Sequence, residues 1–507
     1  MRVHSLFISD TRAEAITVEY HSRFQIPGFQ ILGLPAPEIQ EARERIASSF
    51  SSSGFELPKK KILINLAPAS VRKSGTGHDL SIALKILSET IELPWPAMAL
   101  ARGELGLDGS VRSAGGIAHL IDLLLREFNE HPLPILLLAP DDHREFERLC
   151  QWRRSRGLRV PEPERIGVIS NLRELPGVMQ ESRPTPAPEL PPEETPPGSP
   201  ELLPLPPFQE RIVKLGSIGR HHVLVLGPKG VGKSNSFEWF RHLASPPPAP
   251  LAWERALYVE SRSERPRFDL PVRRIHAQVK PPHLLGSFGP KGFRAGELSL
   301  AHGGILFADE FLEWARDSKE CLREPLQTQK LLITRVKGTI EAKCDIQLVA
   351  SGNLCHCGGF PARLKASGIK SKIGCRCSEP EVRSYLQKLS GPILDRIDLI
   401  ALFGEVPAPP REARRSLGEI KNEIESARNF ALERFGRLPG MMDPSDLEKW
   451  APSAGNAEKI LSELGSLRSR HKVIRVALSI QTLEHSAVLK EEHLLESRSY
   501  RFLETLF

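Results

Sequence analysis

The residues best suited to chemistry in this sequence form a glycine-rich segment in the middle of the chain, HHVLVLGPKGVGKSNSFEWF. The segment matches the pattern G-x-x-x-x-G-K-[ST], in which an apolar strand runs into a loop and the loop into a helix. Backbone N–H groups of such a loop surround the β-phosphate of a nucleotide at the helix N-terminus. The lysine reaches the β- and γ-phosphates, and the hydroxyl holds Mg²⁺. The loop predicted to bind ATP consists of Gly227, Pro228, Lys229, Gly230, Val231, Gly232, Lys233 and Ser234.

A second apolar run, GGILFADE, ends in two acidic residues. Hydrolysis of a bound nucleotide requires one carboxylate near the magnesium ion and a second that polarises water. We assign Asp309 to the metal and Glu310 to general-base work. An Asp-Glu pair after a strand is also common as a solvated turn, so the assignment depends on the phosphate-binding loop upstream.

A third run, IQLVASGN, ends on Asn353. In ATPases built this way, a polar residue at that strand tip lies between the acidic groups and positions the attacking water or senses the γ-phosphate. Two arginines further on, Arg396 in SGPILDRIDLI and Arg475 in HKVIRVALSI, are further candidates. Taken singly, each is better explained as a surface arginine whose stem covers apolar residues.

These motifs require an α/β fold with a parallel sheet, because the working loops must meet at the carboxyl ends of the strands. Short β-like runs alternate with helical patterns before residue 183, and the pattern is helical after residue 405. Between Pro184 and Pro207, eleven of 24 residues are proline, which favours an extended spacer. The predicted parts are an N-terminal domain (1–182), a proline-rich linker (183–207), an ATPase core (208–405) and a helical lid (406–507).

The length is that of a protein whose stability does not need disulfides. At 507 residues the chain should hold two or three domains, each with its own core. The N-terminal segment has no apolar signal-like region, and no stretch approaches the roughly 18 apolar residues of a membrane span. We therefore expect a soluble, cytoplasmic protein with no membrane contact. The net charge of +7 favours an acidic partner such as nucleic acid, but only mildly.

Four of the seven cysteines form two Cys-x-Cys pairs with 17 residues between them. In a reducing compartment, clustered cysteines are typical of metal sites or redox centres. Four thiolates could complete a tetrahedral shell around Zn²⁺, with His356 as an alternative ligand and four reduced thiols on a loop as the other interpretation. Cys150, Cys321 and Cys344 stand alone. The candidate zinc ligands are Cys355, Cys357, Cys375 and Cys377.

Several long segments resemble, in the same order, the ComM/YifB family of magnesium-chelatase-like AAA+ ATPases. They include ILGLPAPEIQEARERIASSF, RAGELSLAHGGILFADEFLEW, CLREPLQTQKLLITR, NLCHCGG and CRCSEPEVRSYLQKLSGPILDRIDL. The resemblance implies that Arg396 is an arginine finger for a neighbouring subunit's ATP and Arg475 a second sensor arginine. It also implies a homo-oligomeric ring, most often a hexamer, and ATP-driven branch migration in natural transformation or DNA repair. The family keeps both cysteine pairs, which favours zinc.

The sequence departs from the family at two places. The family's Asn-Pro-Cys-Pro-Cys-Gly reads here as NLCHCG, with Leu354 and His356 in place of the prolines, so the loop is expected to be less rigid. Three positions after Arg475, where relatives tend to have another arginine, this chain has Leu478.

The N-terminal domain resembles the α+β fold of Lon-type proteases, which use a serine activated by a lysine. By that resemblance, the serine position falls near Gly77 and the lysine position near Ala118. Ser74, Ser81 and Lys73 lie nearby but do not form a recognisable dyad. We therefore expect this domain to be proteolytically inactive.

Two basic segments are candidates for DNA contact. The run LLITRVKGTIEAKC predicts a hairpin, where Arg335 and Lys337 either track phosphates or are solvated charges. The loop FPARLKASGIKSK, between the cysteine pairs, would touch DNA or a neighbouring subunit. We thus expect a motor on single-stranded or branched DNA that works with recombination proteins. The alternatives are a chelatase- or chaperone-like ATPase that remodels a protein partner, and an ATP-binding scaffold with little turnover.

Overall fold

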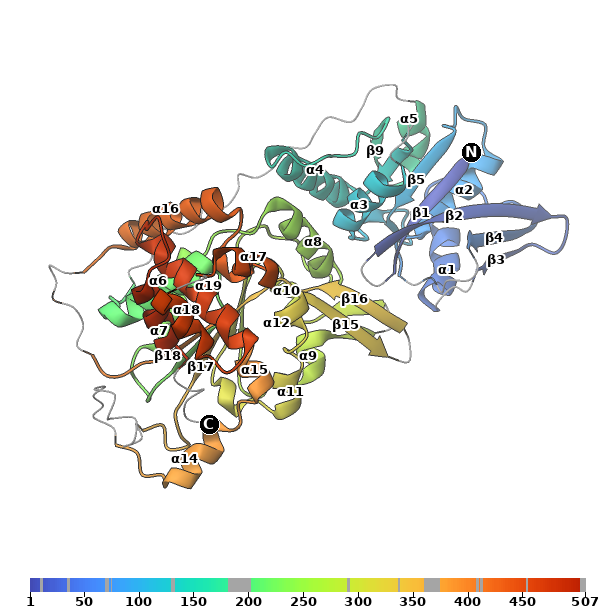
Figure 1. Cartoon of the computed structure of the whole chain (residues 1–507). Coiled ribbons are helices and arrows are strands. Elements are labelled where there is room, and N and C mark those ends of the chain that lie inside the picture. The colour runs from blue at the N-terminus through green and yellow to red at the C-terminus, as the bar shows by residue number, and fades with distance from the viewer. Residues whose placement is uncertain are drawn as a thin grey trace. The chain divides into compact units, whose positions relative to one another are not determined.

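The computed structural model of the chain packs into two compact units (Figure 1). The described residues are 1–9, 12–33, 37–68, 73, 75–128, 133–180, 202–289, 292–335, 338–359, 374–406, 410, 414–452 and 455–501. Unit 1 comprises Met1–Thr195, Ala249–Phe268 and Ser287–Ala295, and unit 2 comprises Pro196–Pro248, Asp269–Gly286 and Gly296–Phe507.

Unit 1 is built on a mixed seven-stranded sheet of order β3-β4-β2-β1-β5-β8-β9. β4 shows why the sheet forms, since its residues alternate between buried and half-buried positions as a strand with one covered face requires. The strands are β1 (Arg2–Ser9), β2 (Arg12–Arg23), β3 (Gly28–Leu32), β4 (Lys61–Ala67), β5 (Met98–Arg102), β8 (Ile135–Leu138) and β9 (Ile166–Val168), with a small hairpin of β6 (Glu104–Leu105) and β7 (Val111–Arg112). The helices are α1 (Pro37–Ser52), α2 (Asp79–Thr90), α3 (Ile117–Glu127), α4 (Pro140–Ser155), α5 (Leu175–Gln180) and α8 (Ala249–Glu260).

Residues 249–268 belong to unit 1 although they follow the phosphate-binding loop in sequence. Phe268 stacks on Trp152 of α4 with 3.7 Å between ring centroids, and Trp253 of α8 stacks on Trp152 at 6.4 Å. Stacked aromatic rings of this kind bury much apolar area. The predicted boundaries placed this segment in the ATPase core, whereas its packing groups it with the N-terminal residues.

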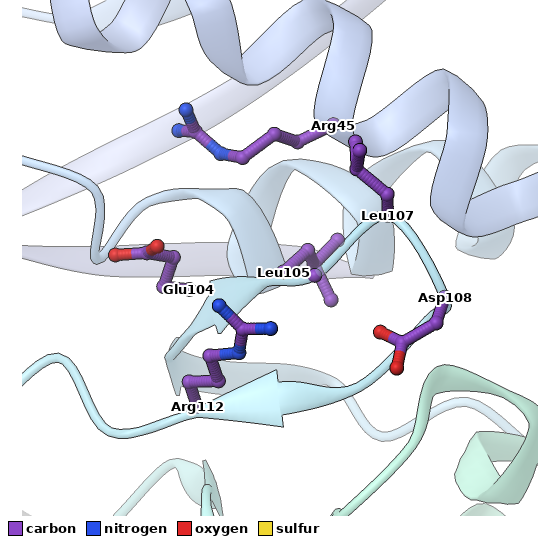
Figure 2. Close-up of a pocket in the computed structure, with 7 residues that line it drawn as sticks. Arg45, Glu104, Leu105, Leu107, Asp108 and Arg112 are labelled. Atoms are coloured by element: carbon purple, nitrogen blue, oxygen red, sulfur yellow. The ribbon is translucent and has the colours of Figure 1, made fainter.

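A cavity of about 310 Å³ lies between α1 and the β6–β7 hairpin (Figure 2). Arg45 of α1 and Arg112 of β7 line it together with Glu104 and Asp108. The guanidinium of Arg45 donates two hydrogen bonds to the carboxylate of Asp79, at 2.8 and 3.1 Å. This ion pair therefore links α1 to the start of α2, and the carboxylate of Asp79 balances the charge of Arg45.

Unit 2 contains a five-stranded parallel sheet of order β11-β14-β17-β10-β18. The predicted α/β fold with a parallel sheet is thus confirmed. The strands are β10 (Val223–Leu226), β11 (Val272–Ile275), β14 (Ile305–Ala308), β17 (Gln347–Gly352) and β18 (Leu399–Leu402), with a separate hairpin of β15 (Lys330–Arg335) and β16 (Gly338–Lys343). A second hairpin, β12 (Gly286–Gly289) with β13 (Gly292–Ala295), belongs to unit 1 from Ser287 on. Helices among and before the strands are α6 (Pro207–Gly219), α7 (Lys233–Leu243), α9 (Pro281–Leu285), α10 (Glu297–Leu300), α11 (Arg316–Glu320), α12 (Pro325–Thr328), α14 (Glu379–Leu386) and α15 (Gly391–Leu394).

The C-terminal part of unit 2 is helical, as the sequence pattern predicts. α16 begins with a capping box, in which the hydroxyl of Ser416 accepts from the N–H of Glu419 at 3.2 Å. Its buried residues Ile420, Ile424 and Ala427 recur at helical spacing and belong to the same core cluster as Val223 and Val225 of β10. The helices are α16 (Leu417–Phe435), α17 (Pro444–Trp450), α18 (Gly455–Ser462), α19 (Leu467–Leu483) and α20 (Glu491–Ser499). Among the described residues, no helix combines the length and apolar character needed to cross a membrane.

Candidate functional site: a nucleotide site at the edge of the parallel sheet

The phosphate-binding loop connects β10 to α7, in the strand-loop-helix order that its sequence predicts. Gly230 and Gly232 have φ values of 85° and 91°, a region that favours glycine. The N–H of Gly227 donates to the carbonyl of Gly352 at the end of β17. On the other side, the buried amide of Gln209 donates to the carbonyl of Val231 at 2.9 Å. Neighbouring elements therefore hold the loop from two sides.

Lys233 lies at the start of α7 and reaches across the loop. Its Nζ donates to the carbonyls of Gly227 and Pro228, at 2.7 and 2.8 Å, and to Oδ1 of Asn353 at 3.1 Å. Burial lowers the pKa of Lys233 to about 8, against the nearby carboxylates, which favour the charged form. The structure thus brings the predicted phosphate-binding lysine and the predicted sensor residue into direct contact.

The affinity for ATP is expected to fall as the pH rises above about 8. The pKa of Lys233 lies below its ordinary value, so the ammonium is present below that pH and lost above it. Phosphate oxygens favour the ammonium, so binding should take up protons in this range. Titration with a fluorescent ATP analogue between about pH 7 and about pH 9 measures the effect. Lys233→Arg keeps its charge throughout. If the ATP affinities of the unaltered protein and of Lys233→Arg changed with pH in the same way, Lys233 would not be the group that titrates.

Asp309 follows β14, and its carboxylate is held by two side chains from other strands. Ser351 of β17 donates to Oδ1 at 2.7 Å, and Arg274 of β11 donates to Oδ2 at 2.8 Å. Burial opposes ionisation of the carboxyl group, but these hydrogen bonds outweigh it and the pKa of Asp309 lies below its ordinary value. Because β17 lies between β10 and β14, Asn353 at its end lies between the phosphate-binding loop and this carboxylate.

Glu310 has φ = 48°, in the left-handed region, and its side chain is exposed. A non-glycine residue in this conformation costs on the order of 1 kcal/mol and persists only where its surroundings hold it. Here the N–H of Glu310 donates to the hydroxyl of Ser351 at 3.3 Å. Glu310 is therefore exposed to solvent directly after the carboxyl end of β14.

Sequence reasoning missed three residues that shape this site: Gln209, Arg274 and Ser351. The two-residue period of a strand places Ser351 on the same side as Asn353, so that signal was available. Gln209 and Arg274 reach their partners through long-range packing, which has no local sequence signature.

The two candidate arginines lie near the amino ends of the strands, whereas the phosphate-binding loop lies at their carboxyl ends. Arg396 precedes β18 and donates to the carbonyls of Arg323 and Pro392, at 2.7 and 2.6 Å, and to the amide oxygen of Gln327. Strands in this sheet are parallel, so the start of β18 is remote from the carboxyl ends that carry the phosphate-binding loop. Arg396 is therefore not brought to its own chain's nucleotide site.

Arg475 of α19 lies near the amino ends of the strands as well. Its Nη1 is 3.8 Å from Oδ1 of Asp398, which also precedes β18, and its Nη2 donates to the carbonyl of Met442 at 2.9 Å. Arg475 therefore makes contacts away from the phosphate-binding loop of its own chain, and its role as a sensor stays a prediction.

The four clustered cysteines lie together directly after Asn353. The Sγ atom of Cys355 is 3.2 Å from that of Cys357 and 3.3 Å from that of Cys375, and all four Sγ atoms, including that of Cys377, lie within 4.8 Å of one another. Tetrahedral zinc with four thiolates requires Sγ separations of about 3.8 Å. A backbone hydrogen bond from Arg376 lowers the pKa of Cys357 to about 6, which favours the thiolate, whereas burial raises the pKa of Cys355 and of Cys375. The donor set fits a Zn²⁺ ion.

Cys375→Ser is expected to lower the zinc content from about one ion per chain to a small fraction of that value, because three thiolates hold the ion less tightly. Elemental analysis after dialysis measures the ratio. Cys321→Ser, outside the cluster, is the matched control and should keep its zinc. Unaltered protein with well under one zinc per chain would contradict the assignment.

The cysteine cluster contacts the phosphate-binding loop. The N–H of Lys229 donates to the carbonyl of Gly358 at 3.2 Å, and the side chain of Lys229 packs on Gly358, which has φ = 71°. The N–H of the next residue, Gly359, donates to Sγ of Cys357 at 3.4 Å. An ion held by the cysteines would therefore stiffen a segment that supports the loop.

The predicted DNA contacts lie at the limit of the described residues. β15 and β16 form the expected hairpin, in which Arg335 pairs with Gly338. Lys337, the side chain of Arg335 and the basic segment 360–372, with Arg363, Lys365, Lys370 and Lys372, lie outside the described residues. The role of these residues stays a prediction.

Buried polar groups surround the two positions at which the Lon-type resemblance would put the serine and the lysine. A side chain on Gly77 would meet the buried guanidinium of Arg102 at 2.8 Å. The N–H groups of Ala118 and His119 donate to the carboxylate of Glu260 of α8, at 2.8 and 3.1 Å. Lys73 is buried and bonded to the carbonyl of Pro68, the hydroxyl of Ser81 donates to the carbonyl of His78, and Ser74 lies outside the described residues.

A parallel sheet with a phosphate-binding loop after one strand, carboxylates after a second and a polar residue between them defines a P-loop nucleoside triphosphatase. The chain matches three family models in order: "Subunit ChlI of Mg-chelatase" over residues 18–131, "Magnesium chelatase, subunit ChlI" over 207–409, and "Magnesium chelatase, subunit ChlI C-terminal" over 415–501. It belongs to the magnesium-chelatase-like family of AAA+ ATPases.

Two full-length relatives support this membership. The uncharacterized protein YifB of Escherichia coli is 27% identical over 99% of this chain and 97% of its own length. The competence protein ComM of Haemophilus influenzae is 28% identical over 98% of this chain and 97% of its own length. The predicted family resemblance is therefore confirmed.

Proposed function

We propose that this protein is a DNA motor that hydrolyses ATP and acts, as a homo-oligomeric ring, on single-stranded or branched DNA. The observation that carries the ATPase part is the contact between Lys233 and Asn353 beside Asp309. This contact brings together residues that follow the carboxyl ends of the neighbouring strands β10, β17 and β14, where a nucleotide and its metal would bind. The placement of Arg396 near the amino ends of the strands supports a ring, because only another subunit could bring such an arginine to this site.

Each side chain has a task that follows from its position. The N–H groups of the loop and the ammonium of Lys233 bind the phosphates of ATP. Ser234, in the first turn of α7, and Asp309 would hold Mg²⁺, which neutralises charge that develops on the phosphate oxygens. The hydrogen bonds from Ser351 and Arg274 keep Asp309 ionised for this task.

Hydrolysis needs a base that is open to water. Glu310 is exposed at the end of β14 and would take a proton from the attacking water. Asn353, already bonded to Lys233, would orient that water or read the presence of the γ-phosphate. Arg396 of a neighbouring subunit would stabilise charge on the transferred phosphoryl group, and Arg475 would act as a second sensor in the assembled ring.

The cysteine cluster is proposed to bind structural Zn²⁺. Such a metal would connect two parts of the site. One is the end of β17, where Asn353 lies, and the other is the phosphate-binding loop, whose Lys229 bonds to Gly358 beside the cysteines. The basic segment 360–372 between the cysteine pairs would then follow changes at the γ-phosphate and touch DNA or a neighbouring subunit.

DNA is proposed as the substrate on three grounds. A relative over nearly the full length is a competence protein, the chain is basic overall, and β15 and β16 form a hairpin in the segment that carries Arg335 and Lys337. We infer branch migration of recombination intermediates, in natural transformation or repair, by a cytoplasmic hexamer that works with recombination proteins. The N-terminal domain would be Lon-like and proteolytically inactive, since Gly77 and Ala118 stand near the positions that the resemblance gives to the dyad, Arg102 lies against Gly77 and Glu260 accepts from the N–H of Ala118.

The test is steady-state ATP hydrolysis without DNA, with single-stranded DNA and with a four-way junction, with Lys233→Ala as the blank. Strong stimulation by DNA that Lys233→Ala abolishes is the expected result. Turnover indifferent to DNA would overturn the proposal in favour of an ATPase that remodels a protein partner. Tight ATP binding with negligible turnover would overturn it in favour of a nucleotide-dependent scaffold.

A further inference from the structure

The loop between β2 and β3 leaves two large apolar side chains in water. Phe24 and Ile26 are each 88% exposed, more than any other large apolar side chain among the described residues. Isolated exposed apolar residues are ordinary, but two that are separated only by Gln25 in one loop indicate a contact surface. We call residues 24–27 the β2–β3 tip.

Basic residues surround this tip. Arg23 ends β2 and pairs with Lys61 of β4, which in turn pairs with Gly28 of β3. The carbonyl of Lys60 accepts from the N–H of Gly28, and exposed Lys59 precedes it. The strand register therefore gathers four cations, Arg23 and Lys59 to Lys61, around the tip. Glu56 is the nearby exposed acidic residue in the chain segment that leads into β4.

The aromatic ring of Phe24 is already in contact with one of these cations. Nζ of Lys60 lies over the ring, 4.1 Å from its centroid. A cation over one face of an exposed aromatic ring leaves the other face free for a flat partner. Proteins that bind single-stranded nucleic acid combine such features, because bases stack on aromatic side chains while cations contact the phosphates.

We propose that the β2–β3 tip binds single-stranded DNA, with one base stacked on Phe24 and with Arg23, Lys59 and Lys60 at the flanking phosphates. This inference rests on the proposed function and adds a DNA site outside the ATPase unit. Stacking tolerates any base, so the tip should grip DNA without sequence preference. Two apolar side chains bury too little area for stable membrane anchoring, and a neutral protein partner would not call for four cations.

The experiment uses the full-length protein and a fluorescent oligothymidylate of single-stranded DNA. Phe24→Ala is expected to weaken binding by about fivefold or more, the lower limit for one lost stacking contact. Phe24→Leu should weaken binding similarly, because leucine is apolar but has no ring on which a base can stack. Phe24→Trp keeps an aromatic ring and should preserve binding. Leu107→Ala is the matched control, since Leu107 is a 62% exposed apolar residue of the same unit. ATP hydrolysis without DNA should be unchanged in all four variants.

A photocrosslink from 5-iodouracil in the oligonucleotide should map to Phe24 and vanish in Phe24→Leu. If unaltered protein binds DNA and Phe24→Ala binds equally well, the tip inference fails while the proposed function stands. If unaltered protein neither binds DNA nor responds to it, the proposed function itself fails. Binding to phosphatidylserine vesicles that depends on Phe24, without a matching effect on DNA, would overturn the inference in favour of a membrane contact.

Discussion

Glu310→Gln is expected to bind ATP as the unaltered protein does and to hydrolyse it about 10²- to 10⁴-fold more slowly. Glutamine has the shape of glutamate but cannot accept a proton from water. The phosphate contacts come from the loop and Lys233, so the affinity should be retained. Because the side chain of Glu310 is exposed, the change leaves the core intact. Single-turnover hydrolysis of labelled ATP, beside nucleotide binding by fluorescence, separates the two effects.

Glu313→Gln is the matched control for this prediction. Glu313 lies three residues further on, and its carboxylate pairs with Lys388 at 3.0 Å. Loss of such a surface ion pair has little energetic effect, so hydrolysis should stay close to that of the unaltered protein. Equal hydrolysis rates for Glu310→Gln and Glu313→Gln would rule out Glu310 as the general base.

The ATP-binding loop could be predicted because its chemistry is local. Glycines, Lys233 and Ser234 occur at fixed spacing, and an apolar strand precedes them. The helical lid could be predicted for the same reason, since Ile420, Ile424 and Ala427 follow helical periodicity in one segment.

Features that depend on strand order could not be predicted from local patterns, and the place of Asn353 was expected only by analogy with other ATPases. Nothing local says that β17 lies between β10 and β14, yet this order brings Asn353 to Lys233 and Ser351 to Asp309. Likewise, the helical pattern of α8 did not reveal that Trp253 packs against Trp152 in the N-terminal unit. Pairings between distant segments are decided by packing of the whole unit, which a window of sequence does not contain.

Arg396→Ala is expected to slow ATP hydrolysis about 10³- to 10⁵-fold, the range for loss of an arginine finger, while each chain still binds ATP. The guanidinium is oriented by the carbonyls of Arg323 and Pro392 at the sheet edge opposite the nucleotide loop. An arginine held there cannot serve its own chain's site. Its loss should therefore be visible only in the assembled ring. Arg468→Ala is the matched control, because Arg468 is 62% exposed and lies 3.6 Å from Asp395 beside Arg396.

Mixing two inactive variants distinguishes a finger that acts on a neighbour from a residue that only supports the fold. Chains with Lys233→Ala lack their own ATP site but carry Arg396, and chains with Arg396→Ala keep an intact ATP site. In a mixed ring, the first kind of chain completes the site of the second, so the mixture should hydrolyse ATP although neither protein does so alone. A folding defect in Arg396→Ala would not be repaired by a partner that binds no ATP. Mixed rings that form, as a pull-down with two affinity tags would report, and yet stay inactive would exclude Arg396 as the finger.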